Sequence, residues 1–235
     1  MENLENDELI DLTNINFNDM KFRSVKRHLF TTQNIMLQKG ANLLWIAVKK
    51  YGLKIDNSYV SESKIVPNER GLFAKRKLVA GDIITIYPAD LAFERDNMND
   101  NHSDKISSMT LVGEKYYNYR FSGKDDEYNP EVMTNEFNNY FKSYLLELTD
   151  KVTIAGHPDL IDDNSYVGHM INDASILLKK DKKYQEKYLK SSNEGSNCEF
   201  KFCNYVRFIV ATKDIEQDEE ILVSYGVKYW LSKLK

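Results

Sequence analysis

Hydrophobic and polar positions follow two different patterns along the chain. Between about residues 17 and 52, apolar side chains recur near helical spacing, and the stretch ends in a cationic turn followed by Gly52. From Tyr59 onwards, short apolar or β-branched runs alternate with turn residues. Short, frequently broken runs indicate a β-rich domain rather than alternating βαβ units. The strands predicted in this way are residues 59–61, 83–87, 151–154, 200–212 and 221–223.

Polar stretches interrupt the predicted β-rich domain twice. Residues 94–108 are rich in Asp, Asn and Ser, and residues 179–197 are charged and begin with a predicted helix. A further helix is predicted for residues 131–144, because its apolar positions fall on one face. We therefore expect a first insert at about residues 94–145 and a second at about 179–197.

These patterns predict two regions. Residues 1–57 form an N-terminal helical region, and residues 58–235 form the main domain with its two inserts. The helical region is predicted to be a cap packed on the main domain, with a separate partner-binding module as the alternative. Residues 1 to about 15 are acidic and polar, and we expect them to be frayed.

Composition changes this picture only a little. Hydrophobic residues make up 42% of the chain and aromatic residues 12%, which is enough for a packed core. The net charge of -4 suits a basic peptide substrate and argues against direct binding of nucleic acid. No apolar run approaches the ~20 residues that span a bilayer, and the acidic start of the chain does not resemble a signal peptide. These features predict a nuclear or cytoplasmic protein that is not secreted and has no membrane partner.

The cysteines do not indicate a metal site. The chain has two, Cys198 and Cys203, and without a secretory context we expect reduced thiols. A zinc site would need His157 or His169 to complete its ligands. We therefore expect no metal.

Three stretches carry the candidate chemistry. The first, ERGLFA at residues 69–74, contains Gly71, which lets backbone approach a ligand or adopt a tight turn. The second, DNSYVGHMINDAS at 163–175, places Asn172 after an apolar approach, as either a ligand-binding amide or an ordinary turn residue. The third, EEILVSYGVKYW at 219–230, places Tyr225 at the end of an apolar run. Taken alone, Tyr225 is either a core residue or a hydroxyl that points into an active site.

In this order, the three stretches resemble the SET domain of protein lysine methyltransferases, over roughly residues 59–230. The resemblance implies a mainly β fold with inserted helices, in which several small sheets surround a C-terminal pseudoknot, with the N-terminal helical segment added. It also implies transfer of a methyl group from S-adenosyl-L-methionine to a lysine side-chain amine in a protein, histone or other, which leaves S-adenosyl-L-homocysteine. The implied partner is a protein or peptide that carries the target lysine.

The resemblance assigns roles to individual residues. Tyr225 is expected to be the catalytic residue, and Val223 and Tyr229 to line the substrate channel. The residues expected to bind the cofactor are Arg70, Gly71, Leu72, Tyr144, Asn172, Asp173 and Trp230. Tyr140 is the alternative to Tyr144, and Trp230 could instead anchor the C-terminus in the core. Because Val223 is smaller than the Phe or Tyr common at its position, we expect more than one methyl group to be added.

The chain departs from the SET pattern at three positions. Glu69 stands where the first glycine of a GxG turn is usual, Asp173 replaces a histidine, and His169 stands where arginine is frequent. The string Asn-His-Ser at residues 101–103 is not the family motif, because it lies in a polar loop without an apolar approach. Two alternatives stay open: a degenerate SET fold that serves as a peptide-binding scaffold, and methylation of a non-protein amine.

Overall fold

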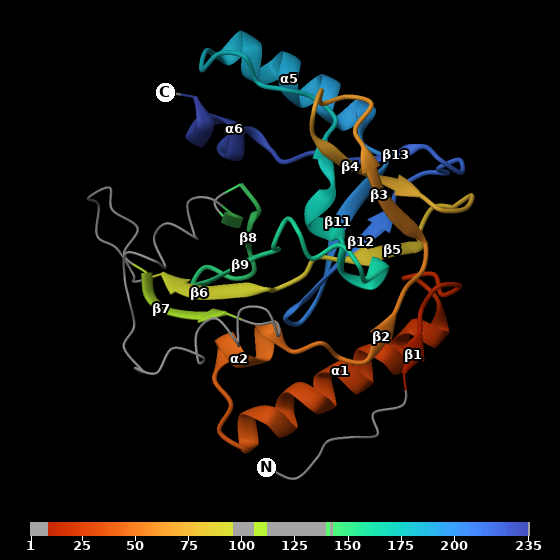
Figure 1. Cartoon of the computed structure of the whole chain (residues 1–235), viewed down its shortest axis with the longest axis vertical. Helices are drawn as coiled ribbons and strands as arrows, with labels where there is room; N and C mark the ends of the chain where they lie inside the picture. Colours follow the sequence, from red (N-terminus) through yellow and green to blue (C-terminus); the bar gives the residue numbers. More distant parts are fainter. Residues whose placement is uncertain (1–8, 96–105, 112–139, 142, 235) are drawn as a thin grey trace.

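The computed structural model describes residues 9–95, 106–111, 140–141 and 143–234 (Figure 1). The described helices are α1 (Met20–Gln38), α2 (Leu43–Val48), α5 (Lys182–Gly195) and α6 (Val227–Lys233), with 3-10 turns at Asn164–Tyr166 and Gly168–Met170. The described strands are β1 (Ile10–Asp11), β2 (Leu53–Lys54), β3 (Ser58–Glu62), β4 (Arg70–Ala74), β5 (Ile83–Ile86), β6 (Leu91–Arg95), β7 (Ile106–Leu111), β8 (Leu145–Glu147), β9 (Val152–Ala155), β10 (Asn172–Asp173), β11 (Cys198–Cys203), β12 (Val206–Ala211) and β13 (Glu220–Val223).

The described strands form several small sheets, with the helices around them (Figure 1). Their orders are β1-β2, β10-β13-β4-β3, β11-β12-β5 and β7-β6-β9-β8. This arrangement confirms the predicted fold class, which was mainly β with small sheets and inserted helices. The second sheet matters most for function, because it joins three stretches that are far apart in sequence. β13 pairs with β4 on one side and, in parallel register, with β10 on the other.

Two predicted elements are interrupted in the structure. The helical pattern of residues 17–52 is divided into α1 and α2, because the Asn42 side chain accepts a 2.8 Å hydrogen bond from the Trp45 N–H and so caps a new helix. The run at residues 200–212 is a hairpin of β11 and β12, which turns at Asn204 with φ of 52°. The predicted helix at 131–144 lies largely outside the described residues. The helix predicted in the second insert is α5.

The N-terminal segment is more ordered than we expected. Ile10 and Asp11 pair with Leu53 and Lys54, and Leu12 is fully buried. The expectation of fraying is therefore wrong from residue 10 onwards, because apolar side chains within this polar stretch reach the core. Residues 1–8 lie outside the described part of the chain.

α1 fastens the N-terminal region to the β-rich domain. Its inner face buries Phe22, Val25 and Leu29 in a cluster that also contains Phe208 of β12. The rings of Phe22 and Phe208 meet edge to face at 5.4 Å, which favours one defined packing. The N-terminal helix therefore shares a hydrophobic core with the sheets.

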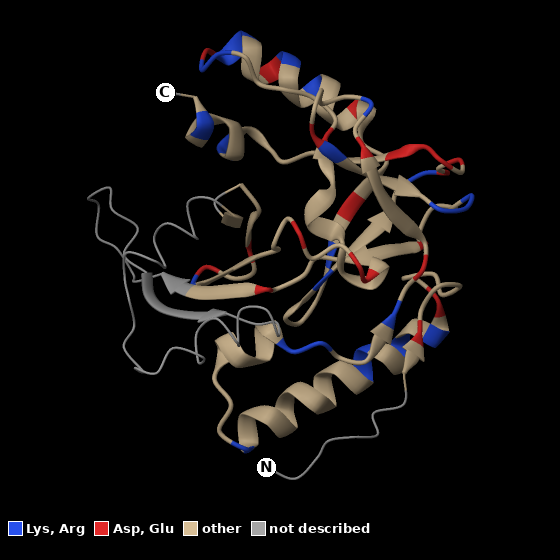
Figure 2. Cartoon of the chain, viewed as in Figure 1, with Lys and Arg blue, Asp and Glu red and all other residues tan. Residues whose placement is uncertain are grey.

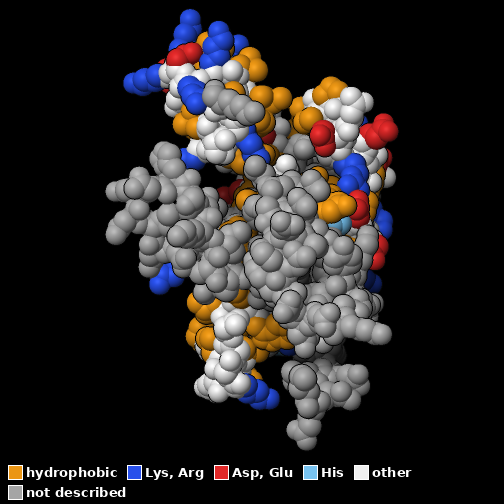
Figure 3. Space-filling view, turned by 60° about the vertical axis from the view of Figure 1, so that its left-hand side comes forward, with side chains coloured by type: hydrophobic (Ala, Val, Ile, Leu, Met, Phe, Trp, Pro, Cys, Tyr) orange, Lys and Arg blue, Asp and Glu red, His pale blue; other side chains and the backbone are white. Residues whose placement is uncertain are grey.

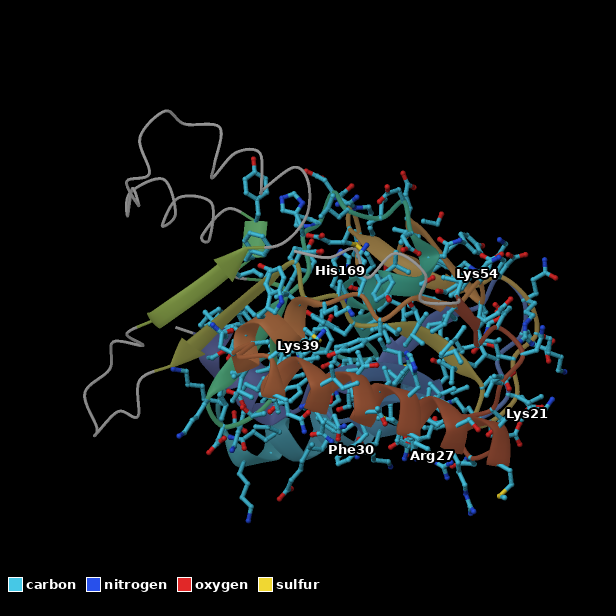
Figure 4. The ribbon with its side chains drawn as sticks, turned by 90° about the horizontal axis from the view of Figure 1, so that it is seen from below. Lys21, Arg27, Phe30, Lys39, Lys54 and His169 are labelled. Carbon is cyan, nitrogen blue, oxygen red and sulfur yellow. The ribbon has the colours of Figure 1, made fainter. Side chains whose placement is uncertain are left out.

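Charged and apolar side chains are distributed unevenly over the surface. Lys21, Arg27 and Phe30 point outwards from α1 (Figure 4), and acidic residues gather in the turn before β13 (Figure 2). Figure 3 shows hydrophobic side chains gathered over the end of α1 and over α2, where Trp45 is 54% exposed. Within the described residues, no helix has both the length and the apolar character needed to cross a membrane.

Candidate active site

Tyr225 occupies the corner between β13 and α6. Gly226, which follows it, has φ of +84°, a left-handed conformation that glycine adopts without strain and that turns the chain into α6. The Tyr225 N–H donates a 3.0 Å hydrogen bond to Asp173, and its hydroxyl donates to the carbonyl oxygen of Ile171. The backbone and the hydroxyl of Tyr225 are therefore both held against the segment around β10.

The Tyr225 hydroxyl keeps its proton. Burial raises the pKa of Tyr225 well above its ordinary value, and the nearby Tyr229 and Asp173 raise it further. A phenol in this state can donate one hydrogen bond and accept others, but it cannot serve as a base at neutral pH. This geometry suits a group that orients a substrate.

Two cavities meet at this tyrosine. One has a volume of about 180 Å³ and the other about 260 Å³. Five residues line both cavities: Ser143, Tyr144, His169, Tyr225 and Tyr229. Ligands in the two cavities would therefore come together beside the Tyr225 side chain.

The smaller cavity has mainly apolar and aromatic walls. Leu145, Leu146, Ile171 and Phe200 line it together with Tyr87. The Tyr87 hydroxyl donates a 2.6 Å hydrogen bond to the carbonyl oxygen of Tyr144, which joins the end of β5 to the segment before β8. Such walls suit an alkyl chain, and we call this cavity the channel.

The larger cavity carries polar groups of both signs beside aromatic rings. Arg70, Glu69 and Asn172 line it together with Trp230. The Asn172 side-chain amide donates to the carbonyl oxygen of Arg70 at 3.0 Å and to Glu220 at 3.2 Å. Because these bonds use its N–H groups, its side-chain oxygen can accept a hydrogen bond from a ligand.

Asp173 joins the segments that build the larger cavity. Its carboxylate is 4% exposed and lies beside the cavity at β10. It accepts hydrogen bonds from the Ser175 N–H (3.1 Å), the Tyr188 hydroxyl (2.5 Å), the Ser192 hydroxyl (2.6 Å), the Tyr225 N–H (3.0 Å) and the Trp230 indole (2.8 Å). One side chain therefore ties α5, the Tyr225 corner and α6 together.

The comparisons with known proteins agree with this geometry. The family model for the SET domain matches residues 69–226, which is more than half of the 235 residues. The chain belongs to the SET domain family. Members of this family are in general protein lysine methyltransferases.

Structural and sequence comparisons beyond the family model add little. A crystal structure of a presumed histone methyltransferase from Plasmodium falciparum matches with 16% sequence identity and a TM-score of 0.34. The match covers 74% of this chain and 97% of the other. A likeness this weak does not bear on the function of the present SET protein. A search of curated sequences finds no significant match.

The residues predicted from the SET resemblance fall into two groups, apart from Gly71, which lies between Arg70 and Leu72 in β4 and lines neither cavity. Those that line the larger cavity are Arg70, Tyr144, Asn172, Asp173, Tyr225, Tyr229 and Trp230. Leu72 and Val223 do not line either cavity, because their side chains are buried in the main hydrophobic core. The motifs did not indicate the cavity residues Tyr87 and Phe200. The sequence pointed to Tyr87 only as the last residue of the strand predicted at 83–87.

Glycine at position 71 is required by close packing rather than by a turn. A Cβ atom there would lie 2.4 Å from Glu220 Oε1 and 3.2 Å from the Asn172 amide nitrogen. Glu220 cannot move away freely, because its carboxylate accepts hydrogen bonds from the Ser63 hydroxyl and the Lys64 N–H, both at 2.7 Å. The glycine therefore allows Asn172 and Glu220 to meet above β4.

Replacing Gly71 by alanine should displace Asn172 and Glu220. We expect a loss of about 1–3 kcal/mol in the free energy of unfolding, as for other overpacked sites. Ligand affinity in the larger cavity should fall as well, because Asn172 lines it. Thermal unfolding and titration with S-adenosylhomocysteine measure the two effects. A variant that matches the wild type in both would show that the packing above Gly71 adjusts at no cost.

A third cavity, of about 410 Å³, lies beside the site, between the segment after α2 and residues 86–90. Tyr87 lines both this third cavity and the channel. Asp90, also on its wall, is 7% exposed and accepts a 2.8 Å hydrogen bond from the His157 N–H. Burial raises the pKa of Asp90 from 3.8 to about 6, so its charged form is disfavoured in the folded protein.

This raised pKa predicts a specific pH dependence. The folded state holds the Asp90 proton more tightly than the unfolded state, so Asp90 lowers stability as pH rises from about 4 to above 6. Asp90→Asn cannot lose a proton, so its free energy of unfolding should rise by up to roughly 3 kcal/mol relative to wild type across that window. Urea unfolding of both proteins between pH 4 and 8 measures this difference. A difference that does not change with pH would mean that the Asp90 pKa is ordinary.

Proposed function

We propose that this SET protein transfers a methyl group from S-adenosylmethionine to the side-chain amine of a lysine in a protein. The observation that carries the proposal is the meeting of an aromatic and apolar channel and a larger polar cavity beside the Tyr225 side chain. The methyl donor and the lysine need separate entrances and a common point of contact. Two cavities that share one wall provide this arrangement.

The residues of the larger cavity suit the chemistry of this cofactor. The Arg70 guanidinium can bind a carboxylate, and the free oxygen of Asn172 can accept a hydrogen bond from an ammonium group. The rings of Tyr229 and Trp230, which meet edge to face at 5.2 Å, can pack against adenine or face a sulfonium cation. S-adenosylmethionine supplies a methyl group activated by its positively charged sulfur.

The channel would help the lysine react by keeping its amine neutral. A free lysine has a pKa near 10.4, so holding it deprotonated at pH 7 costs roughly 4–5 kcal/mol. Walls formed by Tyr87, Leu145 and Phe200 disfavour the charged amine and lower this cost. Tyr225 would then orient the neutral amine, because correct positioning of the reacting atoms supplies most of the rate enhancement in a direct displacement.

The alternative is a SET fold that binds peptides without catalysis. Glu69, which lines the cavity where the family has glycine, is the observation that favours it. The two functions differ in cofactor binding, so calorimetry with S-adenosylhomocysteine separates them. Binding with a measurable heat and a raised melting temperature is expected for the enzyme, and neither for the scaffold.

The substrate can be sought in the same preparation. Incubation with S-adenosylmethionine labelled in its methyl group, together with core histones or cell extract, should label discrete protein bands. Label that resists base and is recovered as methyl-lysine after hydrolysis would support lysine as the acceptor. Label found only in small molecules would instead favour a non-protein amine.

A further inference from the structure

Glu220 is an acidic residue enclosed by the protein beside the larger cavity. It lies on β13, and its side chain is 5% exposed. Burying a carboxylate is unfavourable unless hydrogen bonds replace its contacts with water. Oε1 accepts a hydrogen bond from the Ser63 hydroxyl and Oε2 accepts one from the Lys64 N–H, both at 2.7 Å. The segment after β3 therefore holds both oxygens of this carboxylate in place.

The carboxylate also determines how the Asn172 side chain lies. Asn172 Nδ2 donates to Glu220 Oε1 at 3.2 Å and to the carbonyl oxygen of Arg70 at 3.0 Å. Both partners accept hydrogen bonds, and neither has a hydrogen to give. The Asn172 amide therefore has one favourable orientation, with its nitrogen towards β4 and its oxygen turned away from these two acceptors.

The oxygen of this amide is accessible to a ligand. Asn172 is half-buried and lines the larger cavity, and its Oδ1 makes no hydrogen bond to a described residue. Within the described part of the chain, the buried side-chain atoms without a hydrogen-bond partner are Ser58 Oγ, the Tyr166 hydroxyl, His169 Nδ1 and Arg207 Nε. Asn172 Oδ1 is not one of these enclosed atoms, so a donor in the larger cavity can reach it.

A glutamine at position 220 could not hold Asn172 in the same way. The Lys64 N–H belongs to the backbone and can only donate, so it would take the oxygen of the glutamine amide. The N–H₂ of the glutamine would then face the N–H₂ of Asn172. Asn172 would relieve this conflict by turning its amide over, which directs its own N–H₂ into the cavity. Only a group with two acceptor oxygens suits both the backbone donor and Asn172.

We infer that Glu220 is a positioning residue that directs the Asn172 oxygen towards the ammonium group of S-adenosylmethionine. This role rests on the proposed function and goes beyond it. Glu220 lines neither the channel nor the larger cavity, so it acts through Asn172. The ammonium group is the expected donor, because charged donors form the stronger hydrogen bonds and because Arg70, on the same wall, suits the carboxylate of the cofactor.

Glu220→Gln tests this role with two ligands that differ only in the ammonium group. One is S-adenosylhomocysteine, and the other is its deamino analogue, in which a hydrogen replaces that group. Calorimetry should show about tenfold weaker binding of S-adenosylhomocysteine to the variant, because hydrogen bonds to charged groups have effects of this size. The affinity of the variant for the deamino analogue should stay within about threefold of wild type. Equal losses for the two ligands, or no loss for either, would overturn the inference.

Glu219→Gln is the matched control. It makes the same chemical change at the next residue, whose exposed carboxylate accepts hydrogen bonds from the Glu216 N–H at 3.0 Å and from Asn197 at 3.3 Å. This control should bind both ligands as the wild type does. A loss as large as that of Glu220→Gln would mean that removal of a nearby charge is sufficient, which contradicts a role through Asn172. If the wild type binds no S-adenosylhomocysteine, the proposed function fails, and this is seen before the variants are compared.

The orientation of the amide can also be measured directly, even if Glu220→Gln does not fold. A Cβ on Gly71 would lie 3.2 Å from Asn172 Nδ2, so one Gly71 Hα points towards the N–H₂. Wild-type protein should show a strong nuclear Overhauser effect between this Hα and the Asn172 amide protons, with and without S-adenosylhomocysteine. Asn172→Ala identifies the signals. Absence of the effect in the free protein, or its loss when the ligand binds, would show that the amide lies the other way and would overturn the inference.

Discussion

Tyr225→Phe is expected to lower kcat for methyl transfer roughly 100-fold, because a small misplacement of reacting groups has effects of this size. The substitution removes the hydroxyl of a residue that lines both cavities and leaves the ring in place. Affinity for S-adenosylhomocysteine should remain within about threefold, because the ring still packs against Tyr229 at 4.7 Å. Single-turnover methylation and calorimetry measure the two quantities.

Tyr59→Phe is a suitable control for this variant. The Tyr59 hydroxyl also makes one hydrogen bond, of 2.8 Å, to Asp218 on the surface, and it lies outside both cavities. The control should keep wild-type turnover. If Tyr225→Phe also keeps it, the hydroxyl has no part in the reaction, and the residue is only a packed aromatic.

Asp173→Ala should have the largest effect on stability. It would leave the hydroxyls of Tyr188 and Ser192 and the indole N–H of Trp230 without their acceptor in a buried region. At about 1–3 kcal/mol for each unpaired donor, we expect a loss of more than about 4 kcal/mol in the free energy of unfolding, or failure to fold. Chemical denaturation measures the loss.

Asp173→Asn tests the same network more gently. It keeps the shape of the side chain but presents an amide N–H₂ to groups that also donate, so we expect an intermediate loss. Asp214→Ala, at an exposed position, is the matched control and should stay within about 0.5 kcal/mol of wild type. A stable Asp173→Ala protein with normal ligand affinity would mean that water replaces the lost acceptor.

The sequence was sufficient to locate the framework of the site. The order of ERGLFA, GHMINDAS and VSYG predicted that Arg70, Asn172 and Tyr225 lie near one another, and they line one cavity. Two neighbours of these residues do not line it. Leu72 of β4 and Val223 of β13 are buried in the main hydrophobic core.

The network around the site could not be read from the sequence. Asp173 was predicted to bind the cofactor, at a position where the family has histidine, but the hydrogen bonds that it accepts come from α5 and α6, which are distant in sequence. Hydrogen-bond partners follow from tertiary packing, whereas motifs record only residue type and order.

The two-residue parallel pairing of β10 with β13 also has a consequence for how the length of this protein can change in evolution. Asn172 pairs with Leu222, fifty positions further along the chain, and this short ladder fixes Tyr225 beside Asp173. Closing a loop costs free energy that grows only with the logarithm of its length, about 0.6 kcal/mol for each doubling. Insertions between the two strands are therefore tolerated at little cost, provided that α5 keeps its contacts with Asp173. We expect homologues to differ in length there, and a flexible epitope inserted before α5 should leave the melting temperature nearly unchanged.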